Sequence, residues 1–152
     1  NNRIVAFKLG GTATLPATPA PERPAPPPMP EATAEDLAEG RAAFNRYCAR
    51  CHGADVYGDG SIPDLRYLAP VWHENFAAVV LEGLMEQAGM PRFDDVLDVA
   101  QVEQIHAYII ARAHEDYALR QEQGWLGAVK DYATDISARV AAWLVRFQAG
   151  GD

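Results

Sequence analysis

The chain has 152 residues and a formal net charge of −8, with 49% hydrophobic and 22% charged residues. These values fit one domain with appendages and a real hydrophobic core. The acidic balance argues against nucleic-acid binding, which needs Lys and Arg against phosphate. No apolar run approaches the roughly 18 residues of a membrane-spanning helix, and the two cysteines exclude a disulfide framework.

The first segment, residues 1–11, reads NNRIVAFKLGG and predicts a β-strand. Its apolar residues Val5, Phe7 and Leu9 alternate to one face, and the two glycines that follow end the run. A lone strand is not stable without partner strands. The segment also lacks the charged region and apolar core of a signal peptide. We therefore expect this chain to be the C-terminal piece of a longer protein, with residues 1–11 as the remnant of an upstream β domain.

Residues 12–32 form a proline-rich segment, in which eight of the eleven prolines lie between Pro16 and Pro30. Proline fixes φ and removes a hydrogen-bond donor, so neither a helix nor a central strand is expected there. The composition predicts an extended, semi-rigid linker.

The remainder reads as helices joined by loops, which predicts an all-α domain over residues 33–116. Thr33 can cap a first helix whose first turn carries acidic residues. Asp98, with Gln101 three residues later, predicts a capping box for another helix. Apolar stripes predict a helix over residues 73–84 and a separate amphipathic helix over roughly residues 125–147, within a C-terminal extension of residues 117–152.

The strongest chemical signal is Cys48-Ala49-Arg50-Cys51-His52. Two cysteines three apart at a helix end lie on one face, which suits thioether bonds to both vinyl groups of one haem. The next residue, His52, can then place a ring nitrogen on the iron. C-x-x-C-H is the attachment signature of haem c, and both cysteines of the chain are used in it.

Two other sites remain possible for this motif. A thioredoxin-like dithiol needs C-x-x-C within a βαβ unit, which the sequence does not predict. A structural zinc site needs four ligands, whereas Cys48, Cys51 and His52 supply three.

A second axial ligand is expected from a distant loop, and Met90 is the preferred candidate. It lies in Ala-Gly-Met-Pro, where Gly89 allows the backbone to approach the ring and Pro91 stiffens the loop. The other candidates are Met29, Met85, His73, His106 and His114. Ligation by histidine and methionine raises the reduction potential and leaves no open position on the iron. The motif therefore predicts electron transfer rather than oxygen or peroxide chemistry.

The loop after the motif contains further candidate haem-pocket residues. The Pro63 carbonyl can accept the His52 ring N–H, Leu65 can pack on the haem face, and Arg66 can pair with a haem propionate. A solvated surface arginine is an equal alternative for Arg66. Gly40 can allow a close helix crossing opposite Tyr108.

Together these residues resemble a class I cytochrome c. The runs SIPDLRY (61–67), VLEGLMEQAGMPRF (80–93) and 96–115 resemble the C-terminal haem domain of quinohaemoprotein alcohol dehydrogenases. The opening strand is similar to the end of that family's β-propeller, and the proline-rich segment is similar to its interdomain linker. The resemblance covers roughly residues 1–116.

The resemblance implies a class I cytochrome c fold, with Cys48 and Cys51 attaching one haem c and with His52 and Met90 as its axial ligands. The family couples this domain to a pyrroloquinoline quinone (PQQ) propeller with bound Ca²⁺, which oxidises an alcohol. None of the quinone-site residues are in this chain, which is therefore expected to carry electrons rather than to be an enzyme alone. Its expected partners are the upstream propeller and a downstream cytochrome, copper protein or quinone.

A free-standing monohaem cytochrome c, or the haem subunit of another periplasmic respiratory dehydrogenase, is the alternative. Haem c attachment on the outer side of the bacterial inner membrane predicts a periplasmic location in either case. The extension departs from the family. Its polar face mixes Lys130, Arg139 and Arg146 with Asp131 and Asp135, which favours packing within the protein over binding a membrane surface.

Overall fold

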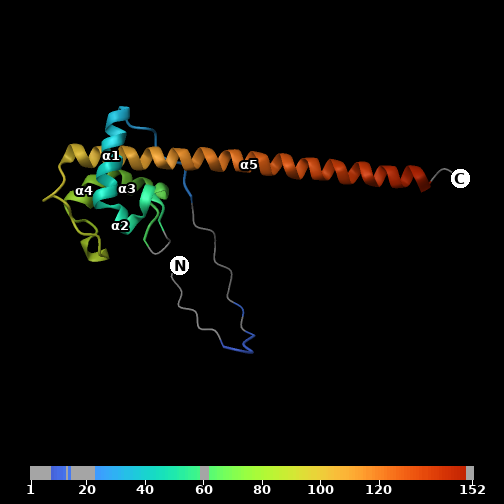
Figure 1. Cartoon of the computed structure of the whole chain (residues 1–152), viewed down its shortest axis with the longest axis horizontal. Coiled ribbons are helices and arrows are strands. Elements are labelled where there is room, and N and C mark those ends of the chain that lie inside the picture. Colours follow the sequence, from blue (N-terminus) through green and yellow to red (C-terminus); the bar gives the residue numbers. More distant parts are fainter. Residues whose placement is uncertain (1–7, 13, 15–22, 59–61, 150–152) are drawn as a thin grey trace. The chain divides into compact units, whose positions relative to one another are not determined.

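The computed structural model describes residues 8–12, 14, 23–58 and 62–149 (Figure 1), with side chains described except at 128, 130, 131, 134, 135 and 137–149. The chain divides into two units, Asn1–Glu115 and Asp116–Asp152. The described elements are α1 (Ala34–Tyr47), α2 (Ala49–His52), η1 (Ala54–Val56), η2 (Leu65–Tyr67), α3 (Pro70–Glu74), α4 (Phe76–Leu81), η3 (Glu86–Ala88) and α5 (Val99–Ala149). All of them are helical, and the described residues contain no strand, as the all-α prediction requires.

Helix α1 begins at the predicted cap. The Thr33 hydroxyl accepts the Asp36 N–H at 3.1 Å, and the Asp36 carboxylate accepts the Thr33 N–H at 2.9 Å. These reciprocal bonds satisfy donors that a helix start leaves open. The Thr33 hydroxyl also donates to the Asp36 carboxylate at 2.7 Å, and this bond, together with the one from the Thr33 N–H, holds the pKa of Asp36 below its usual value. The predicted box at Asp98 is also present, with Gln101 N–H donating to the Asp98 side chain at 2.8 Å.

Helices α1 and α5 cross closely at Gly40, which is buried. A Cβ at this position would lie 2.1 Å from the Gln104 carbonyl oxygen and 3.1 Å from the Ile105 nitrogen. The close crossing expected at Gly40 is therefore present, although it is opposite Gln104 rather than Tyr108. The Gln104 side chain also reaches α1, where its amide donates to Glu39 at 2.6 Å.

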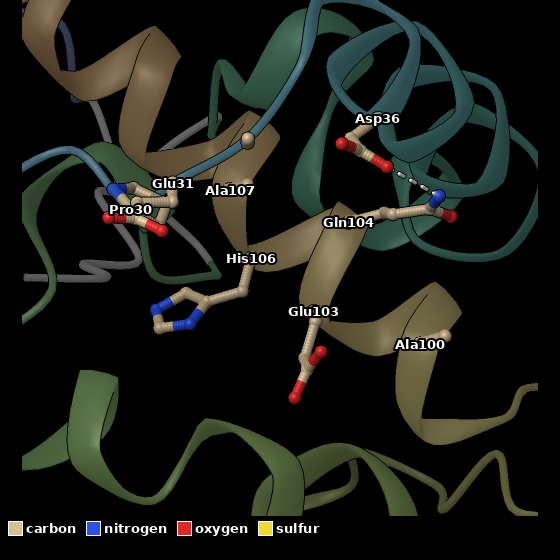
Figure 2. Close-up of a pocket in the computed structure, with 9 residues that line it drawn as sticks. Pro30, Glu31, Asp36, Ala100, Glu103, Gln104, His106 and Ala107 are labelled. Atoms are coloured by element: carbon tan, nitrogen blue, oxygen red, sulfur yellow. Dashed lines mark hydrogen bonds between the residues drawn. The ribbon is translucent and has the colours of Figure 1, made fainter.

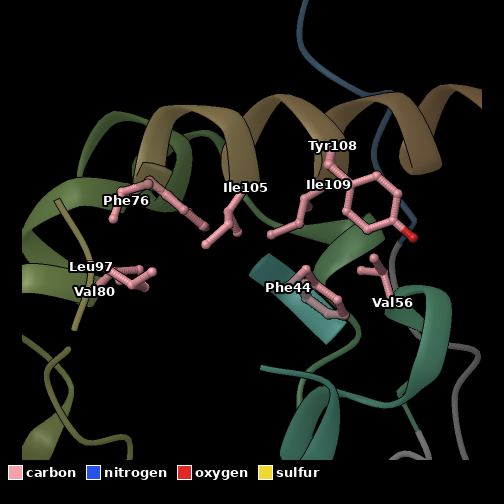
Figure 3. Packing of buried hydrophobic residues seen from close by; sticks show 9 residues of the cluster. Phe44, Val56, Phe76, Val80, Leu97, Ile105, Tyr108 and Ile109 are labelled. Atoms are coloured by element: carbon pink, nitrogen blue, oxygen red, sulfur yellow. The ribbon is translucent and has the colours of Figure 1, made fainter. Parts of the chain in front are cut away.

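One apolar cluster joins α1, α4, α5 and the turn at η1 (Figure 3). Its nine buried residues are Phe44, Val56, Phe76, Val80, Leu97, Val102, Ile105, Tyr108 and Ile109. The Phe44 and Tyr108 rings meet at a centroid distance of 5.7 Å, in the tilted geometry that aromatic pairs favour. The members from α5 recur every three or four residues, so one face of this helix supplies much of the core.

The predicted helix over residues 73–84 is wrong in its boundaries. The structure has α3 and α4 on either side of Asn75, whose side chain donates to the Val71 carbonyl at 2.8 Å. This side-chain bond to the backbone competes with continuing the helix. Phe76 and Val80 are buried as expected, but Leu84 lies beyond α4 and is exposed.

The prediction of two separate helices in the C-terminal part is also wrong, because α5 runs without a break from Val99 to Ala149. The connecting stretch holds no proline, and Gly124 and Gly127 each cost a helix only about 1 kcal/mol. Arg120 Nε donates to Asp116 Oδ2 at 2.8 Å across one helical turn, which supports the helix where the break was expected.

The unit Asp116–Asp152 carries the predicted amphipathic stripe. Its described members Trp125, Val129, Tyr132 and Ile136 are all exposed. Packing of this stripe within the protein therefore stays a prediction. Among the described helices, none is both long enough and apolar enough to cross a lipid bilayer.

The predicted strand lies largely outside the described residues, because the structure describes only residues 8–11 of this segment. These form a turn, closed by Gly11 N–H donating to the Lys8 carbonyl at 3.0 Å. In the linker, residues 23–32 contain neither helix nor strand, as the proline content predicts. They contact the helical unit, since His114 Nε2 lies 2.8 Å from the Pro27 carbonyl oxygen.

Candidate functional site

The C-x-x-C-H motif lies where α1 gives way to α2. Cys48 ends α1, with its N–H donating to the Phe44 carbonyl at 2.8 Å, and its carbonyl accepts the His52 N–H at 2.9 Å as α2 begins. Both cysteines are free thiols; Cys48 is half-buried and Cys51 exposed. Burial raises the pKa of the Cys48 thiol to about 11, with a smaller contribution from Cys51.

The His52 ring has the contact that the sequence predicts. Its Nδ1 lies 3.3 Å from the Pro63 carbonyl oxygen. A carbonyl can only accept a hydrogen bond, so Nδ1 is the protonated nitrogen and Nε2 keeps its lone pair. This tautomer leaves the half-buried imidazole ready to bind a metal through Nε2.

Met90 lies on a loop that is fixed by backbone hydrogen bonds. Its N–H donates to the Met85 carbonyl at 3.2 Å, and Phe93 N–H donates to the Val80 carbonyl at 2.8 Å. Gly89 has φ of 92°, a left-handed conformation that favours glycine. A Cβ there would meet no protein atom within 4 Å, so the approach of Gly89 to a haem ring stays a prediction.

The other ligand candidates have different surroundings. His73 Nδ1 lies 2.9 Å from His106 Nε2, and His114 contacts the linker carbonyl already described. Met29 is exposed on the linker. Met85 is half-buried, but unlike Met90 it does not pack against the apolar cluster. Met90 as the second axial ligand stays a prediction; of the two half-buried methionines, it is the one that packs against the apolar cluster.

A margin of partly buried apolar residues surrounds the core cluster. It consists of Ala43, Tyr47, Cys48, Ala49, Leu65, Leu68, Leu81, Met90 and Phe93. Three predicted site residues, Cys48, Leu65 and Met90, belong to it. A flat, largely apolar macrocycle would complete the burial of this margin, and the motif supplies two thiols and an imidazole nitrogen for its attachment. The residues present therefore fit a haem.

Arg66 has a partner within its own loop, and its pairing with a haem propionate stays a prediction. Its Nε donates to Asp64 Oδ1 at 3.0 Å, and one terminal nitrogen donates to Asp64 Oδ2 at 2.6 Å. The guanidinium carbon lies 4.0 Å from the centre of the Tyr57 ring. The Arg66 side chain is only 8% exposed, which excludes a solvated surface arginine.

The two alternative sites find no support. A reactive dithiol needs a lowered thiol pKa, whereas that of Cys48 is raised. The residues that the structure describes include no group of three His, Cys, Asp or Glu side chains able to hold a metal ion. A zinc site at the motif would need such a group.

One described pocket, of about 320 Å³, lies away from the motif, between the end of the linker, α1 and α5 (Figure 2). Pro30, Asp36, Gln104 and His106 are among its lining residues. Of the predicted haem-site residues, only the axial-ligand candidate His106 is among them. The His106 ring also stacks on Phe76 at 4.3 Å between centroids. Burial lowers the pKa of His106 to about 4, with a smaller contribution from the neighbouring His73. No local sequence signal links these two histidines, which lie 33 positions apart.

Comparison with known proteins agrees with this geometry. A family model described as cytochrome c oxidase, cbb3-type, subunit III, matches residues 35–109. Quinohemoprotein alcohol dehydrogenase ADH IIB of Pseudomonas putida is 38% identical over 123 residues, which is 80% of this chain and 18% of the relative. Quinohemoprotein alcohol dehydrogenase ADH-IIG of the same species is 41% identical over 115 residues, 74% of this chain and 16% of the relative.

The chain contains a cytochrome c domain homologous to the C-terminal haem domain of quinohaemoprotein alcohol dehydrogenases. The solved structure of ADHIIG from Pseudomonas putida HK5 matches with a TM-score of 0.65 and 38% identity, covering 73% of this chain and 16% of that chain. This confirms the predicted family and the cytochrome c-like fold. The cytochrome c chain spans only 16–18% of the length of these relatives.

Proposed function

We propose that this chain transfers electrons through one covalently bound haem c. The observation that carries the proposal is the C-x-x-C-H motif with the ring of its histidine directed by the Pro63 carbonyl. That contact fixes the tautomer which an iron ligand requires and raises the basicity of the ring. When bound, the haem supplies a carrier that takes up and releases one electron at a time.

Cys48 and Cys51 attach the haem in this proposal. Each thiol adds its sulfur and its hydrogen across one vinyl group, so one C–S bond forms per cysteine and no atom is lost. His52 holds the iron through Nε2 and Met90 through its sulfur. Pro63 orients the histidine, while Leu65 covers part of the ring. Arg66, which is bonded to Asp64, would pair with a haem propionate.

We further propose that the electrons come from a PQQ- and Ca²⁺-containing dehydrogenase domain upstream in the same protein. The matches to the two dehydrogenases support this, because they extend over 115 and 123 residues, well beyond the 35–109 of the family model. Oxidation of an alcohol releases two electrons, which a single-haem carrier passes on one by one to a cytochrome, copper protein or quinone. Attachment of haem c places this activity in the periplasm, and the chain by itself performs no substrate chemistry.

A free-standing cytochrome, or a haem subunit of another respiratory complex, is the second candidate. The family model that matches residues 35–109, a subunit of a cbb3-type cytochrome c oxidase, favours it. The two functions differ in their electron donor. Fast reduction by a purified PQQ dehydrogenase domain on addition of alcohol supports the first, and reduction only by another cytochrome or a quinol supports the second.

Intact-mass and visible spectra of the chain, produced in a strain that attaches haem c, test the proposal. We expect the mass of the polypeptide plus one complete haem, and we expect Cys48→Ala with Cys51→Ala to abolish the increase. Met90→Ala should remove the far-red absorption of a methionine–iron bond, whereas the control Met85→Ala should keep it. A wild-type mass equal to that of the amino acids alone would contradict the proposal.

A further inference from the structure

The loop that supplies the Pro63 carbonyl carries a partly buried ion pair. Asp64 and Arg66 have side chains that are 20% and 8% exposed, and they are joined by two nearly parallel N–H···O bonds. The same carboxylate also accepts the Arg66 backbone N–H at 3.1 Å, which starts η2. Both carboxylate oxygens of Asp64 are therefore held from within the loop.

A second segment lies against this pair. The Arg66 guanidinium stacks on the Tyr57 ring, and a terminal nitrogen of Arg112 on α5 lies 3.5 Å from the Tyr57 hydroxyl. A Cβ on Gly58 would lie only 3.0 Å from the Asp64 Cα, so the two segments are also in close backbone contact. The ion pair is thus fixed to the body of the unit as well as to its own loop.

This arrangement bears directly on the carbonyl that contacts His52. The direction of the Pro63 carbonyl depends on rotation of the peptide plane between Pro63 and Asp64. This plane turns about ψ of Pro63 and φ of Asp64, and the side-chain bonds from Asp64 to Arg66 restrain Asp64 on one side of it. Desolvation offsets much of the attraction within such a pair, so its presence is weak evidence of a stabilising role.

We propose that the Asp64–Arg66 pair, stacked on Tyr57, is a positioning device that holds the Pro63 carbonyl against His52 Nδ1 and so sets the reduction potential. The inference rests on the proposed function, in which His52 binds the haem iron. It deepens that function, because it assigns control of the His52 ring, and so of the reduction potential, to side chains that need not touch the haem.

The direction of the change in reduction potential separates positioning from simple charge. Removing the positive charge of Arg66 alone lowers the potential if the residue acts only through its charge, because the oxidised iron is then repelled less. Loosening the Pro63 carbonyl raises the potential, because the imidazole then donates less electron density. The double variant Asp64→Asn with Arg66→Gln leaves the net charge unchanged, so charge alone predicts almost no change.

The test uses the full haem-loaded chain and two measurements, the reduction potential by redox titration and the solvent exchange of the His52 Nδ1–H by NMR. For the double variant we expect a higher potential and exchange about tenfold faster, as for the loss of one hydrogen bond. The matched control is Arg92→Gln with Asp94→Asn, an ion pair of the same spacing whose side chains are 58% and 46% exposed. It should leave exchange unchanged.

If the double variant does not fold, Tyr57→Leu provides the milder change, since Tyr57 is 51% exposed. It removes the aromatic face while keeping both charges, and we again expect faster exchange and a higher potential. If either variant folds and binds haem but keeps the wild-type exchange rate and reduction potential, the positioning role is overturned while the proposed function stands. A wild-type chain without haem absorption would overturn the proposed function and this inference with it.

Discussion

Replacing Gly40 with alanine should destabilise the cytochrome c domain at the crossing of α1 and α5. The new Cβ would lie 2.1 Å from the Gln104 carbonyl oxygen, whereas ordinary contacts begin at 3.4 Å, so the helices must separate by about 1.3 Å. The obstacle is backbone, which cannot rotate away as a side chain can. Moving α1 would also disturb Phe44, which is completely buried.

The expected loss follows from two opposing contributions. Overpacking of this kind costs about 3 kcal/mol, at the upper end of the usual range. Alanine regains about 1 kcal/mol through its helix propensity. The free energy of unfolding should therefore fall by about 2 kcal/mol, equivalent to a decrease in Tm of about 12 °C for a domain the size of residues 33–116.

Urea unfolding of the haem-loaded chain, followed by circular dichroism, measures this loss. Gly127→Ala is the matched control, because it makes the same change within a helix where a Cβ meets nothing within 4 Å. It should leave the unfolding of the domain unchanged and increase the helix content of the extension. A Gly40→Ala chain as stable as the wild type would refute the close crossing.

Three further changes probe contacts on α5. Tyr108→Phe removes a 3.1 Å hydrogen bond to Asp55, which should lower the free energy of unfolding by about 1 kcal/mol in urea titrations. Burial lowers the pKa of His106 from 6.5 to about 4. The contribution of the neutral His106 ring to the free energy of unfolding is therefore fully present above pH 6.5 and is lost as the pH drops toward 4. His106→Phe should reduce this loss between pH 7 and pH 5; an identical pH dependence would contradict it. His114→Leu removes the contact with Pro27, and faster protease cleavage within residues 23–32, without a change in Tm, is the expected outcome.

The features that could be predicted from the sequence are those encoded within a few residues. The capping boxes at Thr33 and Asp98, the C-x-x-C-H motif and the approach of Pro63 to His52 are local in sequence or belong to one loop. Gly40 was informative because a glycine within a helix is costly unless close packing requires it. These signals specify which elements form and which chemistry they carry.

The features that could not be predicted depend on competition or on distance along the chain. The continuity of α5 depends on two glycines being outweighed by good helix formers and ion pairs such as Asp116–Arg120, a balance that an apolar pattern does not report. The pairing of His73 with His106 joins residues that meet only after α3 packs on α5. The bond between Arg66 and Asp64, two residues away, is likewise not indicated by the sequence pattern, because either carboxylate, that of Asp64 or that of a haem propionate, suits the guanidinium.

The crossing at Gly40 also explains how a small helical unit can hold an attachment motif in a fixed position. Cys48 donates its N–H to the carbonyl of Phe44, and the ring of Phe44 packs against Tyr108 in the core. The start of α2 is therefore tied to a residue that cannot move without separating α1 from α5. The loop that follows the motif brings the Pro63 carbonyl back to His52, and the ion pair between Asp64 and Arg66 restrains this loop. The proposed iron ligand His52 is thus held by two independent restraints, one through the core and one through the loop. A change at either should alter the surroundings of the iron before it unfolds the domain.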